Sequence, residues 1–211
     1  MKKLLVLLIS LVMINSVFAQ SEVKLEAGLK PDSPFYFLDK FIEQVQLAFT
    51  RDEVKKAQLY LEIASERLEE LKELNEEEND EFNEDLEEEF EKDLNIAENL
   101  GNDIRELAKK KEFDNLVIQA TSHHIEVLEK VLEKVPKKAK DAIKKVIERS
   151  ERGHERAIED IKKALDEEIE DKDTTKEEKE KIEEEKEKWD DIKEKVKEKS
   201  KKLVLNDKDE E

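Results

Sequence analysis

The three histidines, His123, His124 and His154, are the side chains best suited to bind a transition metal or to transfer protons near neutral pH. His124 falls on the apolar stripe of a helix predicted over 113–135, and His154 on that of a helix predicted over 137–169. If these helices form a hairpin, His154 lies level with about Val117, so the two imidazoles are ~10 Å apart along the axis. A metal site needs three or four converging ligands. We therefore expect packed histidines and no cofactor, and retain the three only as weak candidate metal ligands.

Residues 170–178 (EDKDTTKEE) resemble a calcium-binding loop superficially, because acidic and hydroxyl side chains stand at alternate positions. Such a loop requires Gly at its sixth position and Glu at its twelfth. The chain has Lys176 and Ile182 there. An interhelical turn is the better interpretation, and Thr175 with Glu178 has the spacing of a helix-capping pair.

No arrangement in the sequence indicates catalysis. The chain has 59 acidic residues, so carboxylate pairs on solvated helix faces arise by chance, and no pair stands out as an acid–base couple. The sequence has no cysteine, no Gly-rich phosphate loop, no nucleophile elbow and no HExxH motif. We predict that the protein is not an enzyme.

The charge balance argues against nucleic acid as a partner. The formal net charge is −19 over 211 residues, and a polyanion is repelled by phosphate backbones and by anionic lipid surfaces. With 47% charged residues, 3 Gly and 3 Pro, the composition favours long helices.

The first 19 residues have the layout of a cleavable signal peptide. Lys2 and Lys3 precede the apolar run Leu4–Ile14, and small residues, Val17 and Ala19, stand at the −3 and −1 positions of a cut after Ala19. The alternative is a retained anchor, but a spanning helix needs about 20 apolar residues. We predict secretion or another extracytoplasmic location, with no stable membrane span after cleavage.

Helical periodicity and helix-stop residues divide the remainder. Residues 20–32 are predicted as an extended lead-in, followed by a helical domain over 33–169. Its helices are expected at 34–50, 53–75, 80–110, 113–135 and 137–169. Phe35, Phe41 and Phe49 lie on the apolar stripe of the first helix, which we expect to face the core.

A long C-terminal helix is predicted over 170–205, followed by a disordered acidic tail at 206–211. Its apolar seam repeats every seven residues through Ile182, Trp189, Val196 and Leu203, which is typical of a weakly docked helix or a coiled-coil strand. The predicted fold is all-α: an elongated bundle of five to six helices with a long, partly coiled-coil-like final helix.

Two stretches resemble a prokaryotic family of extracytoplasmic helical domains of unknown function. The first is PDSPFYFLDKFIEQVQLAFTRDEVKKAQLYLEIASERLEEL, with PDSPFY, LAFT and AxxRLEE as the matching pieces; the second is VLEKVLEKVPKKAKDAIKKVIERSERGHERAI. The resemblance implies occurrence in secreted archaeal and bacterial proteins and in anti-sigma-like regulators. It implies a helical fold and no known activity.

These observations favour a non-catalytic extracytoplasmic module that binds a protein partner or associates with itself. The alternative is an extracytoplasmic stress- or metal-responsive helical binding protein, in which the histidines and acidic clusters take a cation.

Overall fold

The computed structural model describes residues 28–170 and 175–205 as an all-α bundle, which confirms the predicted fold class. Over these ranges there are six helices and no strand. They are α2 (Tyr36–Phe49), α3 (Glu53–Glu76), α4 (Asn83–Asn102), α5 (Leu107–Lys134), α6 (Lys137–Glu170) and α7 (Lys176–Leu205). The predicted signal peptide, most of the lead-in and the acidic tail lie outside the described residues.

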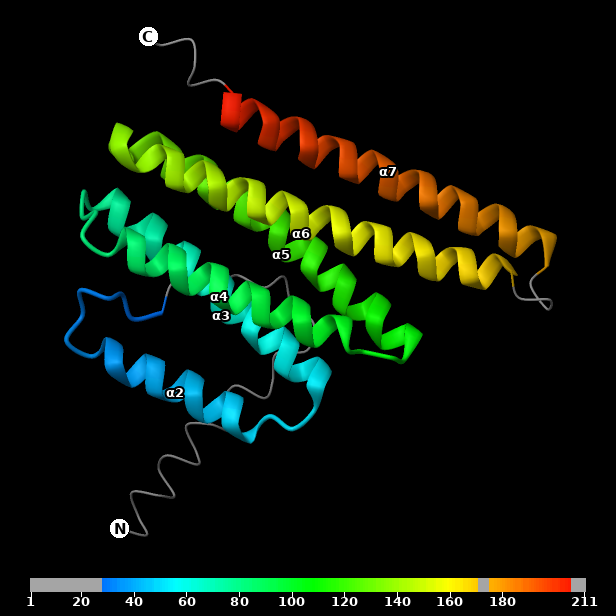
Figure 1. The fold of residues 1–211 in the computed structure, drawn as a ribbon, viewed down its shortest axis with the longest axis horizontal. Helices are drawn as coiled ribbons and strands as arrows, with labels where there is room; N and C mark the ends of the chain where they lie inside the picture. The colour runs from blue at the N-terminus through cyan, green and yellow to red at the C-terminus, as the bar shows by residue number, and fades with distance from the viewer. Residues whose placement is uncertain (1–27, 171–174, 206–211) are drawn as a thin grey trace.

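Helix α2, the pair α3 and α4, the pair α5 and α6, and helix α7 follow one another across the molecule (Figure 1). Helices α3 and α4 form one antiparallel hairpin and α5 and α6 another, and the two hairpins pack mainly through α3 against α5. Helix α2 lies along one edge of the stack, against α3, and α7 lies along the opposite edge, against α6.

The core is formed by the four central helices. Its fully buried side chains include Leu68 and Leu71 of α3, Phe90 of α4, Leu128 of α5 and Ile147 of α6. Helices α2 and α7 each contribute very little to it: Leu47 is the buried apolar residue of α2, and the residue of α7 that is fully buried is Ser200. The two outer helices therefore depend on other contacts.

Several helix boundaries differ from the predicted ones: α4 begins at Asn83 rather than 80, α5 at Leu107 rather than 113, and α7 at Lys176 rather than 170. Helix α2 begins at Tyr36 rather than at residue 34, because residues 31–35 form turns in which Ser33 Oγ accepts from the amide of Phe35 at 3.3 Å. Helix α4 ends at Asn102, not at 110, and residues 107–110 belong to α5. The Phe113 ring of α5 lies against Gly101 in the last turn of α4, where a Cβ would stand 2.0 Å from the ring, so this packing requires glycine.

The basic stretch of α6 lies near acidic α4. Arg149 donates to Glu98 Oε1 and Oε2, at 2.9 Å each, and to Asn95 Oδ1 at 2.6 Å, and Arg156 approaches Glu98 Oε2 at 3.1 Å. Two arginines of α6 thus neutralise a carboxylate of α4. Between residues 28 and 205, leaving out 171–174, no helix is long and apolar enough to cross a membrane.

Candidate interaction surface on helix α2

Helix α2 carries its apolar stripe away from the bundle. Phe37, Phe41 and Phe49 are 64%, 56% and 81% exposed, and Phe35, just before the helix, is 59% exposed. The prediction that Phe35, Phe41 and Phe49 are core residues is therefore wrong. A stripe of this kind normally faces the core of a globular protein.

The outward arc of α2 contains no charged residue. At 100° per residue it covers about 160° of the helix. It is formed by Phe37, Leu38, Phe41, Ile42, Gln44, Val45, Ala48 and Phe49. All three charged residues of the helix, Asp39, Lys40 and Glu43, lie on the opposite side. In a chain with 47% charged residues, such a segregated face is exceptional.

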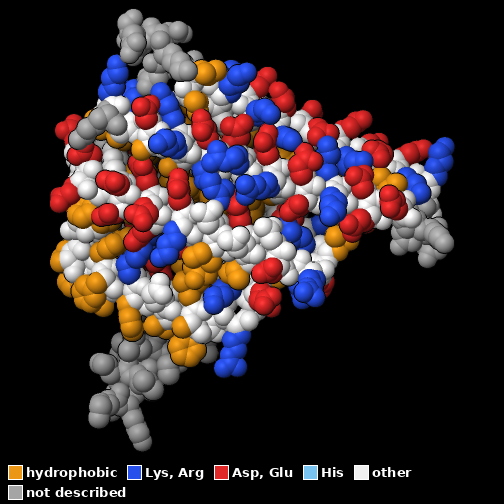
Figure 2. All heavy atoms as spheres, viewed as in Figure 1, with side chains coloured by type: hydrophobic (Ala, Val, Ile, Leu, Met, Phe, Trp, Pro, Cys, Tyr) orange, Lys and Arg blue, Asp and Glu red, His pale blue; other side chains and the backbone are white. Residues whose placement is uncertain are grey.

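Figure 2 shows the resulting surface. Hydrophobic side chains gather over the edge of the molecule where α2 lies, whereas most of the remaining visible face is a mixture of acidic and basic groups. A contiguous apolar area of this kind on a water-exposed protein is the usual mark of an interaction site.

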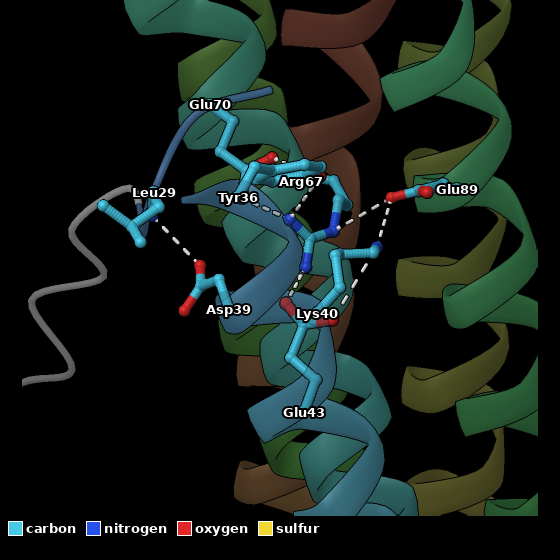
Figure 3. A network of polar contacts seen from close by, with 8 residues as sticks. All are labelled: Leu29, Tyr36, Asp39, Lys40, Glu43, Arg67, Glu70 and Glu89. Atoms are coloured by element: carbon cyan, nitrogen blue, oxygen red, sulfur yellow. Dashed lines mark hydrogen bonds and ion pairs between the residues drawn. The ribbon is translucent and has the colours of Figure 1, made fainter. Parts of the chain in front are cut away.

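The inward side of α2 is held by a buried charged network around Arg67 of α3 (Figure 3). The fully buried guanidinium of Arg67 donates to Glu43 of α2 and to Glu70 of α3, and also to the Tyr36 hydroxyl at 3.1 Å. The Tyr36 hydroxyl in turn donates to Glu70 Oε2 at 3.2 Å.

Helix α4 supplies the third side of this network. Glu89 Oε2 lies 3.4 Å from Arg67 Nε and 2.5 Å from Lys40 Nζ, and Lys40 also lies 3.7 Å from Glu43. Residues from α2, α3 and α4 are thus joined around one guanidinium. Because a buried charge is tolerated only when it is paired and hydrogen-bonded, this network fixes the polar side of α2 inward. The aromatic side must then face out.

The carboxyl groups beneath α2 are strongly affected by burial. Burial raises the pKa of Glu70, although the Arg67 guanidinium opposes this. Burial together with the neighbouring carboxylates of Asp39, Glu70 and Glu62 raises the pKa of Glu66 to about 7. Part of the contact between α2 and α3 is therefore sensitive to protonation near neutral pH.

The first described residues, which precede α2, also contact this helix. The Leu29 amide donates to Asp39 Oδ2 at 3.0 Å, and a Cβ at Gly28 would stand 2.3 Å from that oxygen, so only glycine permits this approach. Leu29 itself is 42% exposed.

The histidines do not converge. His124 Nε2 bonds the hydroxyl of Ser65 of α3 at 2.7 Å, and His154 Nδ1 bonds that of Thr121 of α5 at 3.0 Å, one turn from the predicted level of Val117. His123, half-buried, bonds Glu69 Oε1 at 2.7 Å. Burial lowers the pKa of His124 to about 3 and also lowers that of His154.

Within the part of the chain that the structure describes, no three His, Asp or Glu side chains stand close enough to hold a metal ion. Of the calcium-like stretch, residues 171–174 lie outside the described residues. Thr175 and Glu178 form the expected capping pair: the Thr175 hydroxyl and amide donate to Glu178 Oε2 at 2.7 and 2.8 Å.

A hollow of about 1020 Å³ separates the α2–α3 connection from the α4–α5 connection. Three of its charged side chains have structural partners. Asp52 accepts from the Lys55 amide at 2.9 Å and so caps α3, and Glu106 pairs with Lys109 at 2.7 Å. Nothing in it resembles a nucleophile beside a base.

Sequence reasoning missed Arg67 and its partners. The available signal was local. Arg67 occurs within Glu66-Arg67-Leu68-Glu69-Glu70, on a helix whose apolar stripe predicts that one of its sides is buried. Helical spacing places Arg67 and Glu70 on one face. The contribution of Glu43 and Glu89, from two other helices, is not visible in that spacing.

Fold and surface together define a helical bundle with an exposed aromatic helix and no recognisable reaction centre among the residues the structure describes. Residues 28–138 match a family described as a domain of unknown function (DUF5667), just over half of the chain, and the chain belongs to that family. The match covers α2 to α5 and ends early in α6, within the second stretch on which the resemblance rested. No curated protein and no solved structure matches the chain.

Proposed function

We propose that this protein is a non-catalytic, extracytoplasmic interaction module whose binding surface is the outward arc of α2. The observation that carries the proposal is the exposure of three phenylalanines on a charge-free helix face, with a fourth, Phe35, exposed just before the helix. Exposing this area to water is unfavourable by ~25 cal/mol for each Å², so a partner that covers it gains free energy.

The rigidity of the support favours recognition by a preformed surface. The Arg67 network anchors α2 to α3 and α4, so the aromatic residues are presented in a fixed arrangement. A preorganised surface loses less conformational entropy on binding than a mobile segment does.

Export is part of this proposal and is supported by the sequence of residues 1–19. N-terminal analysis of the protein recovered from its native compartment is the test. A chain that begins at Gln20 supports cleavage, whereas one that begins at Met1 in the membrane fraction supports the retained anchor.

The metal-responsive alternative gains no support from the three histidines, since each is hydrogen-bonded to a different neighbour. Calorimetric titration with zinc and copper tests it. A stoichiometric micromolar site that His124→Ala or His154→Ala abolishes would favour the alternative.

Site-specific photo-crosslinking in the producing cells tests the surface directly. A photoreactive residue at Gln44, exposed within the outward arc, is expected to give a defined protein adduct. The same residue at Glu184, exposed on α7, is the control and is expected to give none. Adducts from both positions, or from neither, would contradict the proposed surface.

A further inference from the structure

We infer that the outward arc of α2 binds the same arc of a second copy of this chain, so that the protein is a two-fold symmetric dimer. The inference rests on the proposed function of this surface and names its partner. In a two-fold interface, one patch on each subunit meets its own copy and must be complementary to itself.

The absence of charge on the arc satisfies this requirement. The chain has a net charge of −19, so most pairs of faces from two copies repel each other. A charged residue near a two-fold axis would also meet its own like charge. The arc presents Phe, Leu, Ile, Val, Ala and Gln alone, while Asp39, Lys40 and Glu43 lie on the opposite side of the helix. Two copies can therefore approach along α2 without opposing charges of the same sign at the centre.

The exposed area is sufficient for a specific contact. Phe35, Phe37, Phe41 and Phe49 are 59%, 64%, 56% and 81% exposed. At ~200 Å² for each side chain, they present on the order of 500 Å² per copy. Two copies would then bury about 1,000 Å² from phenylalanine alone, which is the lower limit for a specific interface. Leu38, 43% exposed, adds to it.

The residues that flank the helix favour an antiparallel arrangement. Asp32 lies just before α2 and Arg51 just after it, and both are exposed. When two α2 helices cross antiparallel near Phe41, Asp32 of one copy approaches Arg51 of the other, twice by symmetry. A parallel arrangement would instead bring Asp32 near Asp32 and Arg51 near Arg51.

A lipid surface is a less favourable partner for the outward arc than a second copy of the chain. Helices that lie in a membrane interface usually carry Lys and Arg around their apolar side. The single Lys of α2, Lys40, is paired with Glu89 at 2.5 Å beneath the helix. The anionic chain would also be repelled by acidic headgroups.

The test is the mass in solution of the protein expressed as the full-length chain and purified after export. Light scattering and sedimentation equilibrium are expected to give twice the chain mass at micromolar concentration. Phe41→Gln and Ala48→Arg, which place polar groups in the arc, are expected to raise the dissociation constant at least 100-fold with unchanged helical circular dichroism. Leu205→Gln alters a comparably exposed leucine on α7 and is the matched control, expected to remain a dimer.

A protein that stays monomeric up to about 100 µM overturns the inference, as does a dimer that Ala48→Arg leaves intact. Cosedimentation with phosphatidylglycerol vesicles through the same residues, without dimers, overturns it in favour of a lipid. The proposed function is judged separately: an adduct from Gln44 with a different protein keeps the interaction surface and rejects self-association.

Charge exchange tests the orientation. Asp32→Lys and Arg51→Glu each place like charges at both ends of the antiparallel pair, and each variant alone is expected to dissociate several-fold more readily. The double variant Asp32→Lys/Arg51→Glu restores opposite charges at both ends and is expected to dimerise as the unchanged chain does. In a parallel dimer each single variant would keep the same number of like-charge contacts as the unchanged chain, so single variants that dimerise undiminished would overturn the antiparallel arrangement.

Discussion

Arg67 shows how one buried side chain decides the orientation of a helix. Its guanidinium lies among carboxylates from α2, α3 and α4, and with them the inward side of α2 becomes polar. The apolar side of the helix is exposed because the opposite side is committed to this network. A single cation therefore determines which residues are available for binding.

We expect Arg67→Ala to lower the free energy of unfolding by about 3–5 kcal/mol, because Glu43 and Glu70 would remain buried without their partner. Chemical denaturation followed by circular dichroism measures this loss. Adding Glu43→Gln to Arg67→Ala is expected to recover part of it. The control, Arg152→Ala, changes an exposed arginine of α6 and should stay within about 0.5 kcal/mol of the unchanged protein.

Glu66 gives the stability a predictable dependence on pH. Its folded-state pKa of about 7 lies above the ordinary value of 4.5, so the folded state binds the proton more tightly than the unfolded state. The stabilising effect of protonation is complete below pH 4.5 and is lost as the pH rises through 7.

Glu66→Gln should therefore raise the free energy of unfolding at pH 8, by up to a few kcal/mol at ~1.4 kcal/mol for each pKa unit, and should change it little at pH 4.5. Thermal denaturation at the two pH values measures the difference. A gain of equal size at both would show that the carboxyl group titrates as it does in the unfolded chain. Glu184→Gln, on the exposed surface of α7, is the control.

At the scale of the helices, α2 and α4 each carry an apolar stripe that includes phenylalanine, and the two stripes lie in opposite environments. Phe41 is 56% exposed and Phe90 is fully buried. Phe41→Ala is expected to change the free energy of unfolding by less than about 1 kcal/mol. Phe90→Ala should cost about 3–5 kcal/mol. A marked loss of stability in dilute, monomeric Phe41→Ala protein would place this ring in the core after all.

This contrast marks what the sequence can and cannot predict. Asp52 and Pro136 identify the start of α3 and the end of α5, because capping and the missing proline amide act locally. Periodicity also reveals the stripe that contains Phe41. It does not reveal the side on which the core lies, since that depends on Arg67 and Glu89, which are distant in sequence. Identifying the proposed interaction surface therefore required knowledge of the fold.

Helix α7 is attached by partly buried apolar residues and by a row of ion pairs. Ile182, Trp189, Ile192 and Leu203 contact the core only in part. The pairs to α6 are Lys186–Asp166, Lys162–Asp190, Lys193–Glu159 and Lys197–Glu155, at 2.7, 2.7, 2.7 and 3.3 Å. Exposed pairs contribute little individually and are weakened by salt.

We expect amide hydrogens over 176–205 to exchange faster than those over 53–76, and to exchange faster still in 0.5 M salt relative to α3. Hydrogen exchange followed by mass spectrometry measures both rates, and the fluorescence of Trp189, the single tryptophan, reports on the same helix. Equal protection of α3 and α7 would indicate that the bundle opens as one cooperative unit.

At the scale of the whole molecule, the region that matches the family ends before the hydrophobic core does. The matched region ends at residue 138, yet Ile143, Ile147, Ile158, Ile161 and Leu165 of α6 are almost completely buried. At ~2 kcal/mol for each side chain, their burial is worth on the order of 10 kcal/mol, which equals the entire stability of an ordinary domain.

A fragment of residues 28–138 is therefore expected to lack a cooperative thermal transition, whereas a fragment of residues 28–170 should retain one. Calorimetry distinguishes the two. Cooperative melting of the shorter fragment at a temperature close to that of the full chain would show that α6 is dispensable.

The packing of α6 against α5 also bears on how such a chain can change over generations. A substitution that enlarges a buried side chain of α5 would collide with the side chains of α6 that pack against it. Such a change is tolerated only with a compensating, smaller side chain on α6. A recombination event that separates them just after residue 138 would divide one core between two genes, and neither product would inherit a complete one. A chain that carried only the counterpart of residues 28–138 would therefore need another helix, or another subunit, in the place that α6 fills here.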